Sequence, residues 1–141
     1  MICVGHYPRR WGRLAVGEVI MRVLPLRAVV VAGDSMTPTL QSGDCLLVYA
    51  GARLRVGDVA LARRPSHLSA GSVGAAPELL LVKRVARRVE GGWWLLSDNA
   101  AAGLDDSRAF GVVPDADIVG RAILRYYPWR RRGGHLLRGP R

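Results

Sequence analysis

The segment from Gly33 to Leu40 (GDSMTPTL) is the part of the sequence best suited to nucleophilic chemistry. It follows the β-branched run Leu26 to Ala32, so Ser35 lies in a loop just after a predicted strand. Gly33 lets the backbone approach a substrate carbonyl, and Pro38 stiffens the chain after the loop. Ser35 could therefore be a nucleophile with its own N–H near the developing oxyanion. An ordinary turn or helix cap is the alternative interpretation of the same pattern.

A lysine inside an apolar run could supply the base. Lys83 lies within Glu78 to Glu90 (ELLLVKRVARRVE). If Leu79 to Val89 is a strand, Lys83 shares a face with the apolar Leu81 and Val85. Burial there disfavours the ammonium form and lowers the lysine pKa, as a lysine general base requires. The alternative is a lysine on an edge strand whose amine reaches solvent.

A third polar group follows these two. Ser97-Asp98-Asn99 precedes the run Asp105 to Gly111 (DDSRAFG). An acid two positions before an arginine can form a charge-assisted pair that locks a loop. We therefore expect Asp106 and Arg108 to shape a site rather than to perform its chemistry.

The histidines and cysteines exclude several other chemistries. His6, His67 and His135 lie near the N-terminus, in a small-residue loop and in the C-terminal tail, so they support neither a Ser-His-Asp triad nor a metal site. We expect no metal and no cofactor. The two cysteines, Cys3 and Cys45, indicate no disulfide framework and are typical of the reducing cytoplasm.

Short apolar runs punctuated by glycine and proline predict an all-β fold of several short antiparallel strands, with at most one or two short helices. The chain of 141 residues suits one domain. A turn at Gly91-Gly92 predicts a hairpin. The expected strands are Leu26–Ala32, Cys45–Ala50, Val59–Arg63, Leu79–Val89, Trp93–Ser97, Phe110–Val113 and Ile118–Tyr127.

Three segments divide the chain. Residues 1–25 form an N-terminal segment, residues 26–128 the main domain with a surface loop at Pro65 to Pro77, and residues 129–141 a basic tail. Helical spacing gathers apolar side chains of the N-terminal segment on one face, with Glu18 and Arg22 off it. A short amphipathic helix that caps the domain is favoured, and binding at a membrane interface is the alternative. The apolar positions are Val16, Val19, Ile20, Val23 and Leu24.

Two features of charge limit the partners. The stretch Leu14 to Ala32 is interrupted by charged residues, so no spanning helix is expected. The net charge of +10 gathers near the two ends of the chain. This distribution indicates solvated tails rather than a nucleic-acid footprint, and we expect no nucleic-acid partner.

In this order, the motifs resemble those of the signal peptidase I family of serine–lysine proteases. GDSMTPTL is similar to the family's nucleophile box, LLVKR to its lysine box, and SDN…DDSRAFG with VPDADIVGRAILRYYP to its C-terminal box. QSGD and VGDV are similar to the strand-turn segments between them, and the resemblance covers residues 28–128.

The resemblance implies an all-β protease in which Ser35 attacks a peptide carbonyl after Lys83 takes its proton. It also implies an extended substrate beside a strand edge, with small side chains next to the scissile bond. Residues expected to shape the site are Gly33, Asp34, Met36, Pro38, Asp98, Asn99, Asp106, Ser107 and Arg108.

The sequence departs from the family pattern in several places. No N-terminal transmembrane anchor is readable, and Ser97 replaces the usual glycine before Asp-Asn. Leu104 stands where the family has a serine that orients the lysine, so Ser97 and Ser107 are alternatives for that role. Gly33 stands where some members have a hydroxyl in the oxyanion hole, which leaves the Ser35 N–H to fill it.

A short, basic chain of this kind also resembles the nickel-type superoxide dismutase maturation proteases of actinobacteria, which trim a leader from the dismutase precursor. This resemblance implies a cytoplasmic enzyme whose partner is that precursor; it leaves peripheral membrane contact and the oligomeric state open. A general leader peptidase acting on secreted proteins at the membrane is the nearest alternative.

Two further alternatives come from other classes. A self-cleaving repressor also uses serine and lysine on a β fold, but residues 1–33 hold too little helix for its DNA-binding domain. A non-catalytic basic module that binds nucleic acid is the other.

Overall fold

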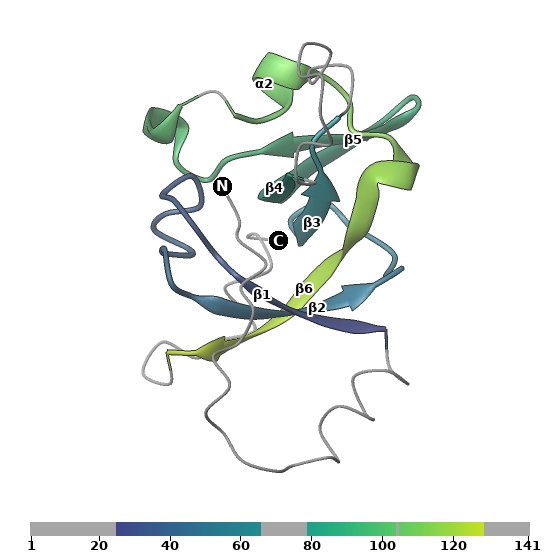
Figure 1. Cartoon of the computed structure of the whole chain (residues 1–141). Coiled ribbons are helices and arrows are strands. Elements are labelled where there is room, and N and C mark those ends of the chain that lie inside the picture. The colour runs from purple at the N-terminus through teal and green to yellow at the C-terminus, as the bar shows by residue number, and fades with distance from the viewer. Residues whose placement is uncertain (1–24, 66–78, 104, 129–141) are drawn as a thin grey trace, which may run out of the picture.

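A computed structural model describes residues 25–65, 79–103 and 105–128 (Figure 1). The predicted N-terminal amphipathic helix, nearly all of the Pro65–Pro77 loop and the basic tail lie outside the described residues, as does Leu104. Those predictions, and the division into three segments, stay predictions.

Six strands form one antiparallel sheet in the order β1-β2-β6-β3-β4-β5, which confirms the all-β prediction. The strand β6 pairs with both β2 and β3 and so joins the lower and upper parts of the view in Figure 1. The strands are β1 (Leu26–Val30), β2 (Cys45–Ala50), β3 (Val59–Arg63), β4 (Leu80–Val89), β5 (Gly92–Leu96) and β6 (Ile118–Tyr127).

Alternating side chains divide the core into two apolar clusters on opposite faces of the sheet. In β3, Val59 and Leu61 belong to the first cluster, whereas Ala60 and Ala62 belong to the second. The first cluster also takes in Met36 and Leu40 from the loop after β1. The second is completed by residues outside the sheet, namely Leu54, Phe110 and Val113.

The strand limits predicted for Cys45–Ala50, Val59–Arg63 and Ile118–Tyr127 agree with the structure. The predicted hairpin is also present, because β4 and β5 pair on either side of Gly91, whose φ is 80°. A glycine suits this turn because other residues seldom adopt a positive φ.

The predicted strand Phe110–Val113 is wrong. Phe110 is the last residue of the short helix α2 (Ser107–Phe110), and Val113 forms a single bridge with Trp93. The helix forms because the Asp106 side chain accepts a hydrogen bond from the Arg108 N–H at its start, and it ends at Gly111, whose φ is 81°.

The remaining elements are two 3-10 helices, η2 (Ala100–Ala102) and η3 (Asp115–Asp117). Within the part of the chain that the structure describes, no helix is long and apolar enough to cross a membrane.

The pairing of β6 with both β2 and β3 depends on Gly120. This residue pairs with Ala50 on one side and Leu61 on the other, and a Cβ atom there would meet the backbone of Tyr49. We expect Gly120→Ala to lower the free energy of unfolding by about 1–3 kcal/mol, because a rigid backbone has to move. Urea denaturation followed by circular dichroism measures this, and a variant as stable as the wild type would contradict the close approach.

Candidate active site

The loop that carries Ser35 begins where β1 ends. Gly33 has a φ of 82° and turns the chain out of the strand. A tight turn follows, in which the Thr37 N–H donates to the Asp34 carbonyl at 3.1 Å and the Leu40 N–H to the Met36 carbonyl at 2.8 Å. The side chains of Met36 and Leu40 are buried in the first cluster and fix the loop to the core. Ser35 lies on this loop and is half-buried.

Asn99 holds this loop from the other side. Its backbone N–H donates to the Ser35 carbonyl at 3.0 Å. Its side-chain amide donates to the Asp34 carbonyl at 3.2 Å and to the Thr37 hydroxyl at 2.9 Å. Asn99, predicted to shape the site, therefore contacts the backbone of the serine itself.

Lys83 lies in the middle of β4 and is 3% exposed. It is on the same side of the strand as Leu81 and Val85, which both belong to the second cluster. Burial lowers the pKa of the Lys83 amine; the carboxylates of Asp105 and Asp106 oppose this shift, and the Arg108 guanidinium adds to it. The interpretation of Lys83 as a surface lysine on an edge strand is wrong.

Ser97 is the residue that contacts the lysine. The Lys83 Nζ atom donates to the Ser97 hydroxyl at 3.1 Å. The hydroxyl of Ser107 instead accepts a hydrogen bond from the Leu95 N–H at 2.9 Å. The sequence left Ser97 and Ser107 as alternatives for the residue that orients the lysine. In the structure Ser97 contacts the Lys83 amine, whereas Ser107 is hydrogen-bonded to the backbone of β5.

The expected ion pair between Asp106 and Arg108 is present, with 2.6 Å between the Arg108 Nη2 and Asp106 Oδ2 atoms. The same carboxylate accepts hydrogen bonds from the N–H groups of Ser97 and Arg108, each at 3.0 Å. Burial alone would raise the pKa of Asp106, but these hydrogen bonds lower it well below its usual range. Asp106 therefore fixes the backbone of the residue that contacts Lys83.

Arg84 points to the opposite side of β4 from Lys83. Its guanidinium binds Asp98 through two hydrogen bonds of 3.0 and 2.6 Å, and it also donates to the Gly57 carbonyl at 2.8 Å. A longer contact of 3.4 Å reaches the Thr39 hydroxyl. The sequence analysis missed Arg84. Its position next to the candidate base Lys83, with the acid Asp98 after the next predicted strand, could have indicated an ion pair.

Arg125 of β6 ties the same loop to the sheet, and the sequence analysis missed it as well. This arginine is 1% exposed and donates to the Thr39 carbonyl at 3.0 Å. It pairs with the buried Asp44 carboxylate at 3.4 Å. No local sequence pattern predicts these contacts, because Arg125 is more than 80 residues away in sequence from both Thr39 and Asp44.

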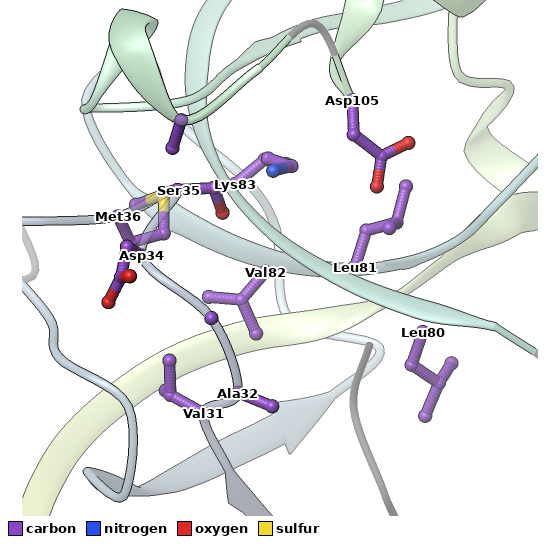
Figure 2. Close-up of a pocket in the computed structure, with 12 residues that line it drawn as sticks. Val31, Ala32, Asp34, Ser35, Met36, Leu80, Leu81, Val82, Lys83 and Asp105 are labelled. Atoms are coloured by element: carbon purple, nitrogen blue, oxygen red, sulfur yellow. The ribbon is translucent and has the colours of Figure 1, made fainter.

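Ser35 and Lys83 line one pocket of about 170 Å³, and Figure 2 shows both at the same end of it. Of the residues expected to shape the site, Gly33, Asp34 and Met36 line the pocket. Asp98, Asn99, Asp106, Ser107 and Arg108 are not among the lining residues and make the contacts described above. Pro38 is exposed and is not among the lining residues. The lining consists of Val31, Ala32, Gly33, Asp34, Ser35, Met36, Leu80, Leu81, Val82, Lys83, Ala102 and Asp105.

Comparison with known proteins identifies the class. The Peptidase S24-like family matches residues 12–123 of this chain, so the chain belongs to that family and is a peptidase. It is also similar to mitochondrial inner membrane protease subunit 1 of Xenopus tropicalis, with 32% identity over 141 residues that span 89% of this chain and 76% of that protein. The family and this similarity together place the chain with the serine proteases of the leader-peptidase type.

The buried Asp106 carboxylate gives a prediction on stability. We expect Asp106→Asn to lower the free energy of unfolding by about 1–3 kcal/mol at pH 7, because a buried amide cannot accept all the hydrogen bonds that the carboxylate accepts from Ser97 and Arg108. A carboxyl with a lowered pKa stabilises the fold above its unfolded pKa, and that stabilisation is lost on acidification. The difference between variant and wild type should therefore narrow below about pH 4 in urea titrations. A difference that does not change with pH would contradict the ion pair.

Proposed function

We propose that this chain is a serine–lysine endopeptidase that removes an N-terminal leader from a precursor protein, with Ser35 as nucleophile and Lys83 as general base. One observation carries the proposal. A buried lysine amine, held by the Ser97 hydroxyl, lies in the same pocket as a serine on a fixed loop. The lowered pKa of Lys83 favours the neutral amine that a base requires.

The reaction follows from these two groups. The neutral Lys83 amine takes the proton of the Ser35 hydroxyl as its oxygen attacks the peptide carbonyl carbon. The ammonium then gives that proton to the leaving amine, and the C–N bond breaks to leave an acyl ester on Ser35. Water, deprotonated by the same amine, hydrolyses the ester and frees the serine.

The developing oxyanion needs a donor. Among the described residues the Ser35 N–H donates no hydrogen bond, whereas the Ser35 carbonyl is occupied by Asn99. This N–H supports the predicted oxyanion role, because the Asp34 carbonyl of the same peptide group accepts hydrogen bonds from the Thr37 N–H and the Asn99 amide, which hold the peptide plane in one orientation.

An extended substrate fits between two strand edges. The strand β4 pairs with β5 only from Arg84 onward, so Leu80 to Lys83 pair with β3 alone among the described residues. On the other side of the pocket, the backbone N–H and C=O groups of Val31 are hydrogen-bonded to Asp44 and Gly43, just before β2. Because successive residues of an extended chain direct these groups to opposite sides, the N–H and C=O groups of Ala32 face the pocket. The small volume of the pocket favours small side chains beside the scissile bond.

For the precursor we propose nickel-type superoxide dismutase, processed in the cytoplasm. This proposal rests on the resemblance of the sequence, above all WWLLSDN…DSRAFG. A general leader peptidase acting at the membrane is the second candidate. Cleavage of a dismutase precursor peptide at its leader junction, measured beside a secretory leader peptide, separates the two.

The dyad is tested by substitution. We expect Ser35→Ala to reduce cleavage to background and Lys83→Ala to lower kcat by about 100- to 10,000-fold, because a general base contributes that much. Lys83→Arg is the matched control that retains a positive charge but cannot act as a base, and it should be as inactive as Lys83→Ala. Circular dichroism checks the fold of each variant. Wild-type cleavage by Ser35→Ala would overturn the proposal.

The pH dependence is a separate test. Activity should rise with pH as Lys83 loses its proton, with a midpoint below the ordinary lysine value of 10.5. The Asp105 carboxylate raises the pKa of Lys83, so Asp105→Asn should move this midpoint to lower pH. Asp117→Asn, in the distant helix η3, is the control and should leave the pH profile of kcat/KM unchanged. A shift to higher pH would contradict the assignment of Lys83 as the base.

A further inference from the structure

A second pocket, of about 470 Å³, lies toward the end of β4 that is remote from the Ser35–Lys83 pocket. The first four residues of β4 line the pocket that holds Ser35 and Lys83, whereas Arg88 lines the second one. From Lys83 to Arg88 the strand runs about 16 Å, and the two pockets share no lining residue. We call the second one the distal pocket, and its lining residues include Arg53, Leu54, Arg88, Trp93, Asp115 and Ile118.

A β-bulge turns Arg88 toward the distal pocket. The pairing of β4 with β5 shifts its register between Val85 and Arg87. Without this shift, alternation would put Arg88 on the opposite side of β4 from Lys83. With it, Arg88 pairs with Trp93, which packs against the second cluster, and its guanidinium lies 4.6 Å from the centre of the Trp93 ring. The distal pocket is therefore built against the second cluster, on the side of the sheet that also holds Lys83.

The charge of the Asp115 carboxylate is balanced within this pocket. Its two oxygens accept hydrogen bonds from the two terminal nitrogens of Arg88 at 2.5 and 2.6 Å, and the Trp93 Nε1 atom donates to Asp115 Oδ1 at 2.8 Å. This is the forked geometry that a guanidinium and a carboxylate favour. The pair adds no net charge, so the sign of the pocket depends on its other charged residue.

That residue is Arg53, in the loop after β2. Among the residues that the structure describes, no hydrogen bond, ion pair or ring contact reaches its exposed guanidinium. The backbone that carries it is nevertheless fixed, because the Leu54 side chain is buried in the second cluster and the Gly51 N–H donates to the Val119 carbonyl at 3.3 Å. The distal pocket therefore presents an unpaired positive charge on an anchored loop.

We propose that the distal pocket binds an acidic segment of the precursor protein, with Arg53 pairing with a carboxylate and Trp93 contacting an apolar neighbour of that carboxylate. This inference rests on the proposed function, because it takes the substrate to be a protein rather than a short peptide. A guanidinium binds a carboxylate through two parallel hydrogen bonds. The net charge of +10 on the whole chain also attracts acidic segments over a longer range.

The size and lining of the distal pocket favour a peptide segment over a small anion. A volume of about 470 Å³ is much larger than a carboxylate or a phosphate group, and Leu54, Trp93 and Ile118 offer apolar surface beside Arg53. A peptide segment fills such a pocket with both its charged and its apolar side chains. About ten extended residues span up to about 34 Å, so a chain that leaves the Ser35–Lys83 pocket can reach Arg53 even by an indirect path.

A binding measurement tests the inference without any cleavage. The probe is a peptide of about ten residues in which glutamate and leucine alternate. It is titrated by calorimetry into the full chain carrying Ser35→Ala, in about 0.15 M salt to screen the basic ends of the chain. We expect Arg53→Gln to weaken binding about tenfold or more, because a charge-assisted pair is lost.

Arg55→Gln is the matched control. Arg55 is an exposed arginine two positions further along the same loop, and it does not line the distal pocket. Its substitution should change the affinity for the acidic peptide by no more than about twofold. A second control is the same peptide with glutamine in place of glutamate, which should bind about tenfold or more weakly to the chain with Arg53 intact. Circular dichroism checks the fold of each variant.

Several results would overturn the inference. Equal loss of affinity in Arg53→Gln and Arg55→Gln, or no loss in either, would show that the peptide responds to net charge rather than to the pocket. Displacement of the peptide by about 1 mM inorganic phosphate would indicate a small-anion site. Failure to bind the peptide, with co-sedimentation on phosphatidylglycerol vesicles that Arg53→Gln abolishes, would indicate a lipid headgroup.

Cleavage kinetics relate the distal pocket to the reaction. The substrate is a leader peptide extended by the acidic segment, before the leader in one version and after the scissile bond in another. For one of the two versions we expect Arg53→Gln to raise KM about tenfold and to leave kcat unchanged, because binding is lost far from the reacting atoms. For the leader peptide without an extension, Arg53→Gln should match the wild type in both parameters.

These kinetics also separate this inference from the proposed function. Wild-type KM values for Arg53→Gln on both extended versions would overturn the inference and leave the roles of Ser35 and Lys83 intact. Absence of cleavage by the wild type on every substrate would count against the proposed function, whereas the calorimetric comparison of Arg53→Gln with Arg55→Gln would still decide whether the distal pocket binds an acidic segment.

Discussion

Burial of the Lys83 amine on an apolar face of β4 is the constraint on which the site depends. An ammonium group beside Leu81 and Val85 has lost its water, and a hydrogen bond to the Ser97 hydroxyl replaces only part of that hydration. Burial therefore favours the neutral form of the amine. Because the strand alternates, the same β4 sends Arg84 to its other side, where a permanent cation has a carboxylate partner.

The polar contacts around this amine connect the loop after β5 and the start of α2 with the Ser35 loop, which is more than 60 residues away in sequence. Asp106 fixes Ser97, Asn99 fixes the Ser35 loop, and Arg84 links Asp98 to Thr39 in that loop. Each contact joins a side chain to a backbone group or to a charged partner, so few rotamers satisfy them all. This arrangement keeps the serine and the lysine at one pocket although each belongs to a different element.

Local patterns were sufficient for much of this fold. The strand limits at Cys45–Ala50 and Ile118–Tyr127 follow from apolar runs between turn residues, and the face of Lys83 follows from alternation alone. Phe110–Val113 was misassigned because a cap at Asp106 and a glycine at 111 outweigh a short apolar run. The contacts of Arg84 and Arg125 with Thr39 could not be predicted, since they depend on how distant segments meet.

The lysine has a further consequence for the chemistry of the whole chain. The sequence holds 21 basic residues, and Lys83 is its single lysine. Arginine guanidinium groups stay protonated in water, so they neither accept a proton nor react with mild electrophiles. Lys83 is thus the one side-chain amine at which an acylating reagent can add. A reagent small enough for the pocket would mark this residue and the chain's α-amine. The mass increment on the peptide that carries Lys83 therefore reports how readily a single buried nitrogen reacts.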